Sequence, residues 1–107
     1  MSSPDLNQLM EQARKAQSRL TELQRELATR RVEGSAGGGM VKAVVSGDLR
    51  VLEVRFEDGL LTAGDREMLQ DLTAAAVNSA LANAQRMIQQ EMQRASGGLN
   101  LTDLGSA

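Results

Sequence analysis

The fold is decided by residues 6–27, which read LNQLMEQARKAQSRLTELQREL. Apolar residues recur there every seven positions, with a second set offset by three: Leu6, Ala13, Leu20 and Leu27, then Leu9, Ala16 and Leu23. This is the a/d pattern of a helix that packs against a second helix. A helix cannot bury such a narrow stripe alone, so it must lie either on the core of its own domain or against another subunit. The continuity of the stripe favours association, and the sequence predicts a dimer or helix-packing seam.

Composition excludes several function classes. The chain has 107 residues, enough for one domain, and contains one Phe and no His, Cys, Trp or Tyr. Without His and Cys, the usual general bases, nucleophiles and thiolate metal ligands are missing, so we expect no enzyme, no metal site and no cofactor. No segment is long and apolar enough to span a membrane, and the N-terminus does not resemble a signal peptide. We therefore expect a cytoplasmic protein without a membrane partner.

A β-hairpin is predicted over residues 40–45 and 49–56. The Gly47-Asp48 pair between these segments is typical of a two-residue turn. That turn would pair Lys42 with Glu53, so that opposite charges face each other on the polar side. The same register pairs Val44 with Val51, Ala43 with Leu52 and Val41 with Val54, and it gathers six apolar residues on one face: Val41, Ala43, Val45, Leu52, Val54 and Phe56.

Two long helices flank the predicted hairpin, over about residues 5–31 and 65–95. Their lengths are about 40 Å and about 46 Å. A compact domain of this size is only about 33 Å across. Because both helices exceed that diameter, we expect a homodimer whose helices extend beyond the sheets as arms.

The ends of these helices carry recognisable signals. Ser2 or Ser3 is expected to cap the first helix, and Thr62 with Asp65 resembles a capping box before the second. A glycine-rich connection precedes the hairpin. Residues 96–107 are rich in glycine and serine and are predicted to be a flexible tail that follows a single domain over residues 1–95.

Charge is unevenly distributed along the chain. Residues 1–31 carry six basic and four acidic groups, whereas residues 32–71 carry four basic and eight acidic groups. The basic residues of the first helix are Arg14, Lys15, Arg19, Arg25, Arg30 and Arg31. Such a face on a protruding helix, doubled in a dimer, could follow the phosphates of DNA, although an ordinary solvated helix surface has the same composition. The scarcity of aromatic rings disfavours recognition of single strands by stacking.

The order of motifs resembles the YbaB/EbfC family of small bacterial nucleoid-associated proteins. The resemblance is carried by LNQLMEQA at residues 6–13, VEG at 32–34 with the glycine run, MVK at 40–42, SGD at 46–48, VLEV at 51–54, LL at 60–61 and EMLQDL at 67–72, which leads into AAAVN at 74–78. It implies an α+β protomer of the order α-β-β-β-α, with its first short strand near residues 32–34, and an intertwined homodimer with long helical arms. It also implies location in the cytoplasm at the nucleoid, backbone contacts to double-stranded DNA, a role in chromosome organisation or gene regulation, and no catalytic motif.

Two function hypotheses from different classes remain open. The leading one is a dimeric nucleoid protein that binds double-stranded DNA. The alternative is a dimeric protein-interaction module whose helical arms hold a partner protein, with DNA contact incidental. A small enzyme is disfavoured because the necessary side chains are absent.

Overall fold

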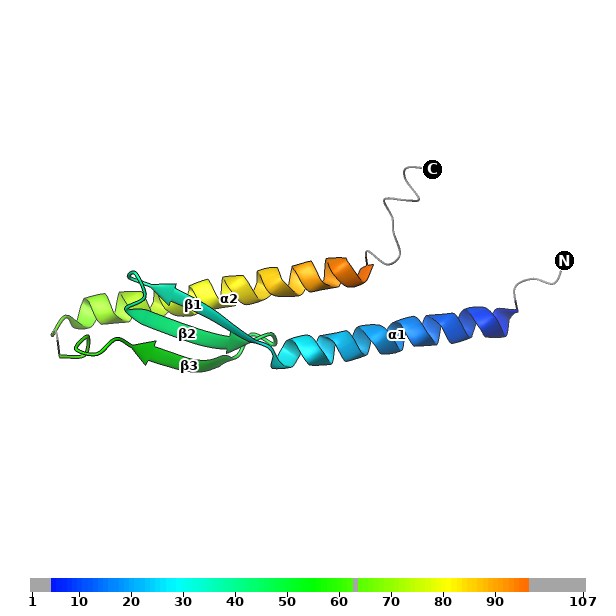
Figure 1. The fold of residues 1–107 in the computed structure, drawn as a ribbon, viewed down its shortest axis with the longest axis horizontal. Coiled ribbons are helices and arrows are strands. Elements are labelled where there is room, and N and C mark those ends of the chain that lie inside the picture. Colours follow the sequence, from blue (N-terminus) through cyan, green and yellow to red (C-terminus); the bar gives the residue numbers. More distant parts are fainter. Residues whose placement is uncertain (1–4, 63, 97–107) are drawn as a thin grey trace, which may run out of the picture.

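The computed structural model describes residues 5–62 and 64–96. The elements, in chain order, are α1 (Leu6–Thr29), β1 (Arg31–Ala36), β2 (Val41–Ser46), β3 (Val51–Phe56) and α2 (Arg66–Ser96). The strands form one antiparallel sheet in the order β1-β2-β3. The predicted α+β class and the α-β-β-β-α order are confirmed (Figure 1).

Helix α1 begins and ends inside the predicted range. Its cap is Asp5, whose carboxylate accepts a hydrogen bond from the amide of Asn7 at 3.4 Å. The predicted caps Ser2 and Ser3 lie outside the described residues. Arg30 already has an extended backbone, and the next residue begins β1, so the helix is shorter and the first strand longer than predicted.

The predicted register of the β2–β3 hairpin is wrong by two residues. The amide of Ser46 donates to the carbonyl of Arg50 at 2.9 Å, so the loop contains three residues instead of two. The third loop residue, Leu49, has a left-handed backbone with φ 63°. A β-bulge then places Leu52 as an extra residue between the pairs Val45–Val51 and Val44–Glu53. Each insertion shifts the pairing by one residue, because neither has a partner across the ladder.

This shift changes the charge pairing and one member of the predicted apolar face: Val51 pairs with Val45, and Leu52, which was predicted to lie on that face, is the unpaired bulge residue. Because the total displacement is even, Val54 still lies on the same face as Ala43, as predicted. The predicted ion pair between Lys42 and Glu53 is wrong, since Lys42 lies opposite Arg55. Lys42 instead approaches Glu33 of β1, with Nζ and Oε1 4.0 Å apart.

Helix α2 is capped by Asp65, whose carboxylate accepts a hydrogen bond from the amide of Met68 at 2.9 Å. The predicted capping box is therefore wrong in its register. Thr62 lies before the helix and donates its hydroxyl hydrogen bond to the carbonyl of Gly59 at 2.9 Å. Ser96 is the last residue of the helix, and the rest of the predicted tail lies outside the described residues.

The core is built from an alanine stripe on α2 against one face of the sheet. The stripe and the strand residues below it are completely buried: Ala76, Ala80 and Ala84 on α2, with Val41, Ala43 and Val45 on β2. Small side chains let the helix backbone approach the sheet closely. At Gly34 on β1, an added β-carbon would stand 2.1 Å from the amide nitrogen of Ala80.

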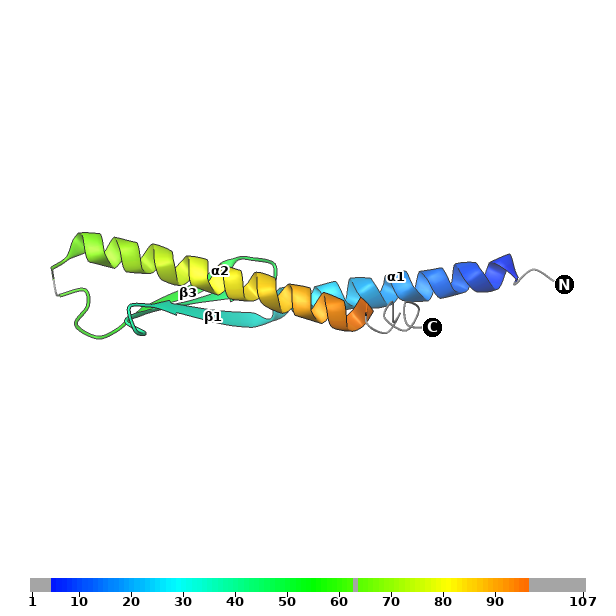
Figure 2. The same cartoon turned by 90° about the horizontal axis from the view of Figure 1, so that it is seen from above.

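The two helices have different relations to the sheet. Helix α2 lies along one face over β1 and β2 and contacts β3 at few points. Helix α1 leaves one end of the sheet and runs away from it, as both views show (Figures 1 and 2). It is anchored only toward its C-terminal end, where Leu23 is half-buried and Leu27, which lies against Gly47 of the hairpin, is 3% exposed.

Candidate nucleic-acid interface

Most of α1 projects away from the sheet and is exposed to solvent. Every residue from Asp5 to Glu22 is exposed, and we call the helical segment 6–22 the arm. Its length is about 25 Å. A helical segment that is exposed at every residue presents its circumference to a ligand.

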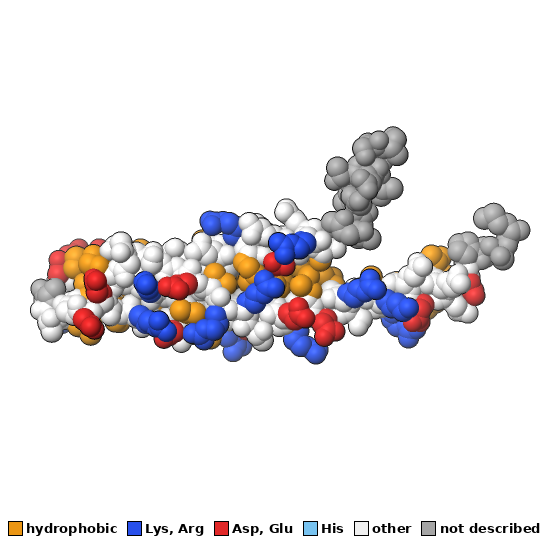
Figure 3. Space-filling view, in the orientation of Figure 1, with side chains coloured by type: hydrophobic (Ala, Val, Ile, Leu, Met, Phe, Trp, Pro, Cys, Tyr) orange, Lys and Arg blue, Asp and Glu red, His pale blue; other side chains and the backbone are white. Residues whose placement is uncertain are grey.

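The predicted basic residues on α1 differ in how they are paired. Arg14 forms an ion pair with Glu11 one turn before it. Lys15, Arg19 and Arg25 are exposed and form no ion pair with any of the described residues. Lys and Arg side chains gather along this helix in the space-filling view (Figure 3). The structure therefore leaves three cations on α1 without a partner in residues 5–62 and 64–96.

Arg30 directly follows the C-terminal end of α1 and forms an ion pair with α2. Its guanidinium Nη1 is 3.3 Å from Glu91 Oε1, and the same carboxylate oxygen is 3.5 Å from Nη1 of Arg94. Two arginines share one carboxylate, so this cluster keeps one net positive charge. Arg94 is the more exposed of the two arginines and gives the cluster an outward-facing cation.

Arg31 lies on the sheet, not on the helix as predicted. Its Nη2 is 3.0 Å from Glu53 Oε2, while Nε of Arg55 is 2.7 Å from Glu53 Oε1. The hydrogen bond from Arg55 and the neighbouring Arg31 charge hold the pKa of the Glu53 carboxyl below its usual range. The same hydrogen bond raises the pKa of Arg55. This cluster too keeps one net positive charge.

Sequence reasoning missed Arg55 and Arg94 as candidate interface residues. Each is close in sequence to its acid, since Glu53 is two residues before Arg55 and Glu91 is three residues before Arg94, and the fold brings Arg31 and Arg30 to the same two acids. Their local ion pairs do not mark them as interface residues, because only the fold shows that a second arginine, from outside β3 and α2, joins each carboxylate. The six predicted residues are thus divided among the arm, its base and two separate arginine clusters.

The predicted seam lies open along the arm. Leu6 is 69% exposed and Leu20 is 38% exposed, and the intervening seam residues Leu9, Ala13 and Ala16 are also exposed. Toward the sheet the seam becomes covered, since Leu23 is half-buried and Leu27 is buried. Within one chain, then, only the C-terminal end of the seam has a packing partner.

The described residues offer little other chemistry. In residues 5–62 and 64–96, no group of three or more acidic or imidazole side chains is arranged to hold a metal ion. None of the helices described is both long and apolar enough to cross a lipid bilayer. What the described residues do show is charged and apolar side chains exposed together on one projecting helix.

The chain is thus a small α+β protein of the order α-β-β-β-α with one projecting, charged helix. Residues 1–99 match the sequence model of the YbaB/EbfC DNA-binding family. The chain belongs to this family, and the resemblance noted from its motifs is confirmed.

Relatives carry names that agree with this family. A nucleoid-associated protein of Desulfotalea psychrophila is 43% identical over 100 residues, which cover 94% of this chain and 94% of that protein. A nucleoid-associated protein of Syntrophobacter fumaroxidans is 46% identical over 95 residues, which cover 89% of this chain and 86% of that protein.

A solved structure shares the fold. The crystal structure of an uncharacterized protein from Helicobacter pylori superposes with a TM-score of 0.69 and covers 86% of this chain and 97% of that one. At 20% sequence identity, this likeness supports the architecture alone.

Proposed function

We propose that the protein is a nucleoid-associated protein that binds double-stranded DNA as a homodimer through backbone contacts, with a role in chromosome organisation or gene regulation. Membership of a DNA-binding family and the names of the relatives support this proposal. The observation that carries it is the exposed arm, whose Lys15 and Arg19 form no ion pair with any of the residues that the structure describes.

Phosphate contacts are the interaction that this surface can best make. Lys15 and Arg19 are one helical turn apart, and Arg25 lies about 15 Å from Lys15 along the helix axis. Over that length, duplex DNA carries about nine negative charges. Lysine and arginine side chains neutralise phosphates without reading bases, so we expect weak dependence on sequence. Arg14, Arg30 and Arg31 would contribute less, because each already has a carboxylate partner.

The homodimer is proposed from the seam. A stripe of leucines and alanines that is exposed to water in one chain is unfavourable, and covering it with another apolar surface lowers the free energy. A second copy would present a matching stripe and would double the number of arms. Two arms on one duplex would bind more tightly than either alone, because the second contact is intramolecular.

Salt-dependent titration with duplex DNA tests the function. We would compare the wild type with a Lys15→Gln/Arg19→Gln variant, using an Arg66→Gln/Arg86→Gln variant as the control with the same change in net charge. If both arms of a dimer contact phosphates at these residues, the negative slope of log K against log salt should become shallower, with its magnitude smaller by about 3.6. The control should change it much less. Equal slopes for the wild type and the arm variant would contradict the assignment to the arm, and no binding at low salt would contradict DNA binding itself.

One observation favours the alternative function. The arm exposes three large apolar side chains near its free end: Leu6, Leu9 and Met10. A duplex offers little to such side chains, whereas a helix of a partner protein would cover them. If the titration shows no DNA binding, a dimeric module that holds a partner protein between its arms becomes the better proposal.

A further inference from the structure

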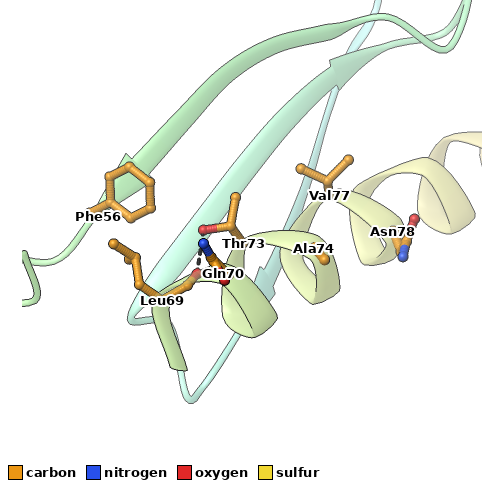
Figure 4. A pocket seen from close by; sticks show the side chains of 7 residues that line it. All are labelled: Phe56, Leu69, Gln70, Thr73, Ala74, Val77 and Asn78. Atoms are coloured by element: carbon orange, nitrogen blue, oxygen red, sulfur yellow. Dashed lines mark hydrogen bonds between the residues drawn. The ribbon is translucent and has the colours of Figure 1, made fainter. Parts of the chain in front are cut away.

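Two hollows lined mainly by apolar side chains lie along α2. The larger, of about 580 Å³, lies between β3 and α2, where the Phe56 ring faces Leu69 and Thr73 (Figure 4). The smaller, of about 230 Å³, lies near the C-terminal end of α2, where that helix meets the end of α1 and the β2–β3 hairpin. We call this smaller hollow the crevice. Its lining consists of Gln24, Leu27, Ala28, Gly47, Asp48, Ile88 and Met92.

The crevice has an apolar floor that is only partly covered. Leu27 is buried, whereas Ala28, Ile88 and Met92 are half-buried. Hydrophobic side chains gather at this junction of α1 and α2 in the space-filling view (Figure 3). An apolar group that filled the space above them would remove more apolar surface from water, which is favourable. The crevice therefore fits a small apolar occupant.

The chain itself supplies apolar side chains next to the crevice. Residues 97–104 follow α2, lie outside the described residues and read GGLNLTDL. Leu99, Leu101 and Leu104 make this segment rich in large apolar residues. Segments that stay unstructured are usually poor in such residues, because they bury little apolar surface. The leucines therefore point to a segment that is covered by another part of the protein.

The segment can reach the crevice. Met92 lies about 6 Å before the end of α2 along the helix axis, and three residues of extended chain span up to about 10 Å. Gly97 and Gly98 give the conformational freedom that a reversal of chain direction needs. The larger hollow is out of range, because Asn78 lies about 27 Å from the end of α2 and the chain up to Leu101 spans at most about 17 Å.

The size of the crevice fits two leucine side chains. In an extended segment, residues two apart point to the same side, so Leu99 and Leu101 can enter together. A protein cavity of about 150 Å³ accepts a molecule of six carbon atoms. The crevice, at about 230 Å³, is therefore large enough for the eight carbon atoms of both side chains.

Charge at the rim of the crevice complements the segment. The cluster of Arg30, Glu91 and Arg94 adjoins it at the end of α1 and the last turns of α2, and this cluster keeps one net positive charge. Asp103 is the only charged residue in 97–104 and follows Leu101 at a distance of about 7 Å in an extended chain. Asp48, the one charged residue of the lining, is already in an ion pair on the hairpin.

We propose that residues 99–104 of this chain dock in the crevice, with Leu99 and Leu101 against its apolar lining and Asp103 beside the arginine cluster. Reach, apolar side chains and charge identify this segment as the occupant. The inference goes beyond the proposed function, since docking needs neither DNA nor a second copy. Its consequence for DNA binding is regulatory, because a docked Asp103 neutralises the cluster and keeps it from phosphate.

Thiol protection tests the docking in the full chain. The chain contains no cysteine, so Ala28→Cys introduces a single thiol into the crevice. In this background, Leu99→Ser/Leu101→Ser should make a maleimide modify the thiol about tenfold faster, as expected if the segment is docked for about nine-tenths of the time. The matched control, Asn100→Ser/Thr102→Ser, keeps the leucines and should leave the rate unchanged.

Two further measurements check that the effect is local. Thr29 is the exposed neighbour of Ala28 and does not line the crevice. A thiol introduced by Thr29→Cys should react at the same rate with and without the two leucines. Circular dichroism verifies that all variants are folded.

Disulfide formation supplies a second readout. Thr102→Cys is combined either with Gln24→Cys in the crevice lining or with Gln90→Cys, which is exposed on α2 outside the lining. Residue 90 lies only about 9 Å from the end of α2, so an undocked segment would meet it often. Docking should instead make the disulfide to residue 24 form faster. Non-reducing electrophoresis separates a disulfide within one chain from one between copies.

The outcomes separate this inference from the proposed function. Faster modification without the two leucines, together with a preferred disulfide to residue 24, supports docking. An equal rate with and without the leucines overturns it. Protection that disappears on dilution, or a disulfide only between copies, overturns it as well, since docking within one chain does not depend on concentration. Neither readout involves DNA, so DNA binding by the arm is judged separately by the titration.

Discussion

Gly34 of β1 and Ala80 of α2 approach so closely that a β-carbon on Gly34 would stand 2.1 Å from the Ala80 amide nitrogen. The neighbouring atom belongs to a helix backbone, which cannot rotate away as a side chain could. This contact sets the distance between the alanine stripe and the sheet, and so determines how the core is packed.

Gly34→Ala should therefore destabilise the fold. We expect the free energy of unfolding to fall by about 2 kcal/mol or more, because the added methyl group forces α2 away from the sheet. Thermal unfolding followed by circular dichroism would show a lower midpoint. Ser35→Ala is the matched control, since Ser35 is the exposed neighbour on the same strand. A Gly34→Ala variant as stable as the control would contradict the close approach.

Leu20→Glu should weaken the association of two copies. Leu20 occupies an a position of the seam, where a charge would be placed among apolar contacts once a second chain covers the arm. We expect a dimer dissociation constant about tenfold higher by sedimentation. Ser18→Glu adds the same charge on the side of the helix away from the seam and should have little effect. An unchanged constant for Leu20→Glu would show that the seam makes no contact between copies.

Arg94→Gln tests whether the cluster of Arg30, Glu91 and Arg94 contacts DNA. In the wild type, Arg30 and Arg94 share Glu91, and loss of Arg94 would leave that cluster electrically neutral. If the cluster contacts a phosphate, the salt slope of binding should fall by about one for each copy in contact. The control is Arg86→Gln, which removes a charge from the middle of the same helix. The same slope for both variants would exclude the Arg30–Arg94 cluster from the interface.

Glu53→Gln should make stability less dependent on pH. Hydrogen bonding to Arg55 and the charge of Arg31 lower the pKa of Glu53, so its ionised form stabilises the fold above its unfolded pKa of about 4.3. That contribution is lost as the pH falls through the lower pKa of the folded state. We expect the variant to melt below the wild type at pH 7, and the difference between them to shrink as the pH falls below the unfolded pKa of about 4.3. A constant difference at all pH values would show that the ion pairs have no part in the effect.

The helices and strands could be predicted because their signals are local. A seven-residue repeat, alternation of apolar and polar residues, and glycine between strands each indicate an element without reference to the rest of the chain. The hairpin register could not be predicted in the same way. It depends on Leu49 in a left-handed conformation and on Leu52 as a bulge, and leucine carries no preference for either.

The candidate site was predictable only in part for a similar reason. Cations on α1 can be counted from the sequence, but their partners cannot. Arg30 is held by Glu91 and Arg31 by Glu53, and both acids reach them only through the fold. That α2 lies over β1 and β2 and leaves β3 largely uncovered was also out of reach, because it depends on where α2 crosses the strands and not on the strands themselves.

Helix α1 is attached to its domain only toward its C-terminal end, where Leu23 is half-buried and Leu27 is buried, and its N-terminal part is exposed. The backbone hydrogen bonds of the arm can then open without unfolding the sheet, and an isolated helix of this length is only marginally stable in water. Amide hydrogens along residues 6–22 should exchange with solvent far faster than those near Ala80. Any ligand that lies along the arm must order it, so part of the binding free energy is consumed in restricting the backbone. Affinity would then depend on the intrinsic helicity of residues that never touch the ligand.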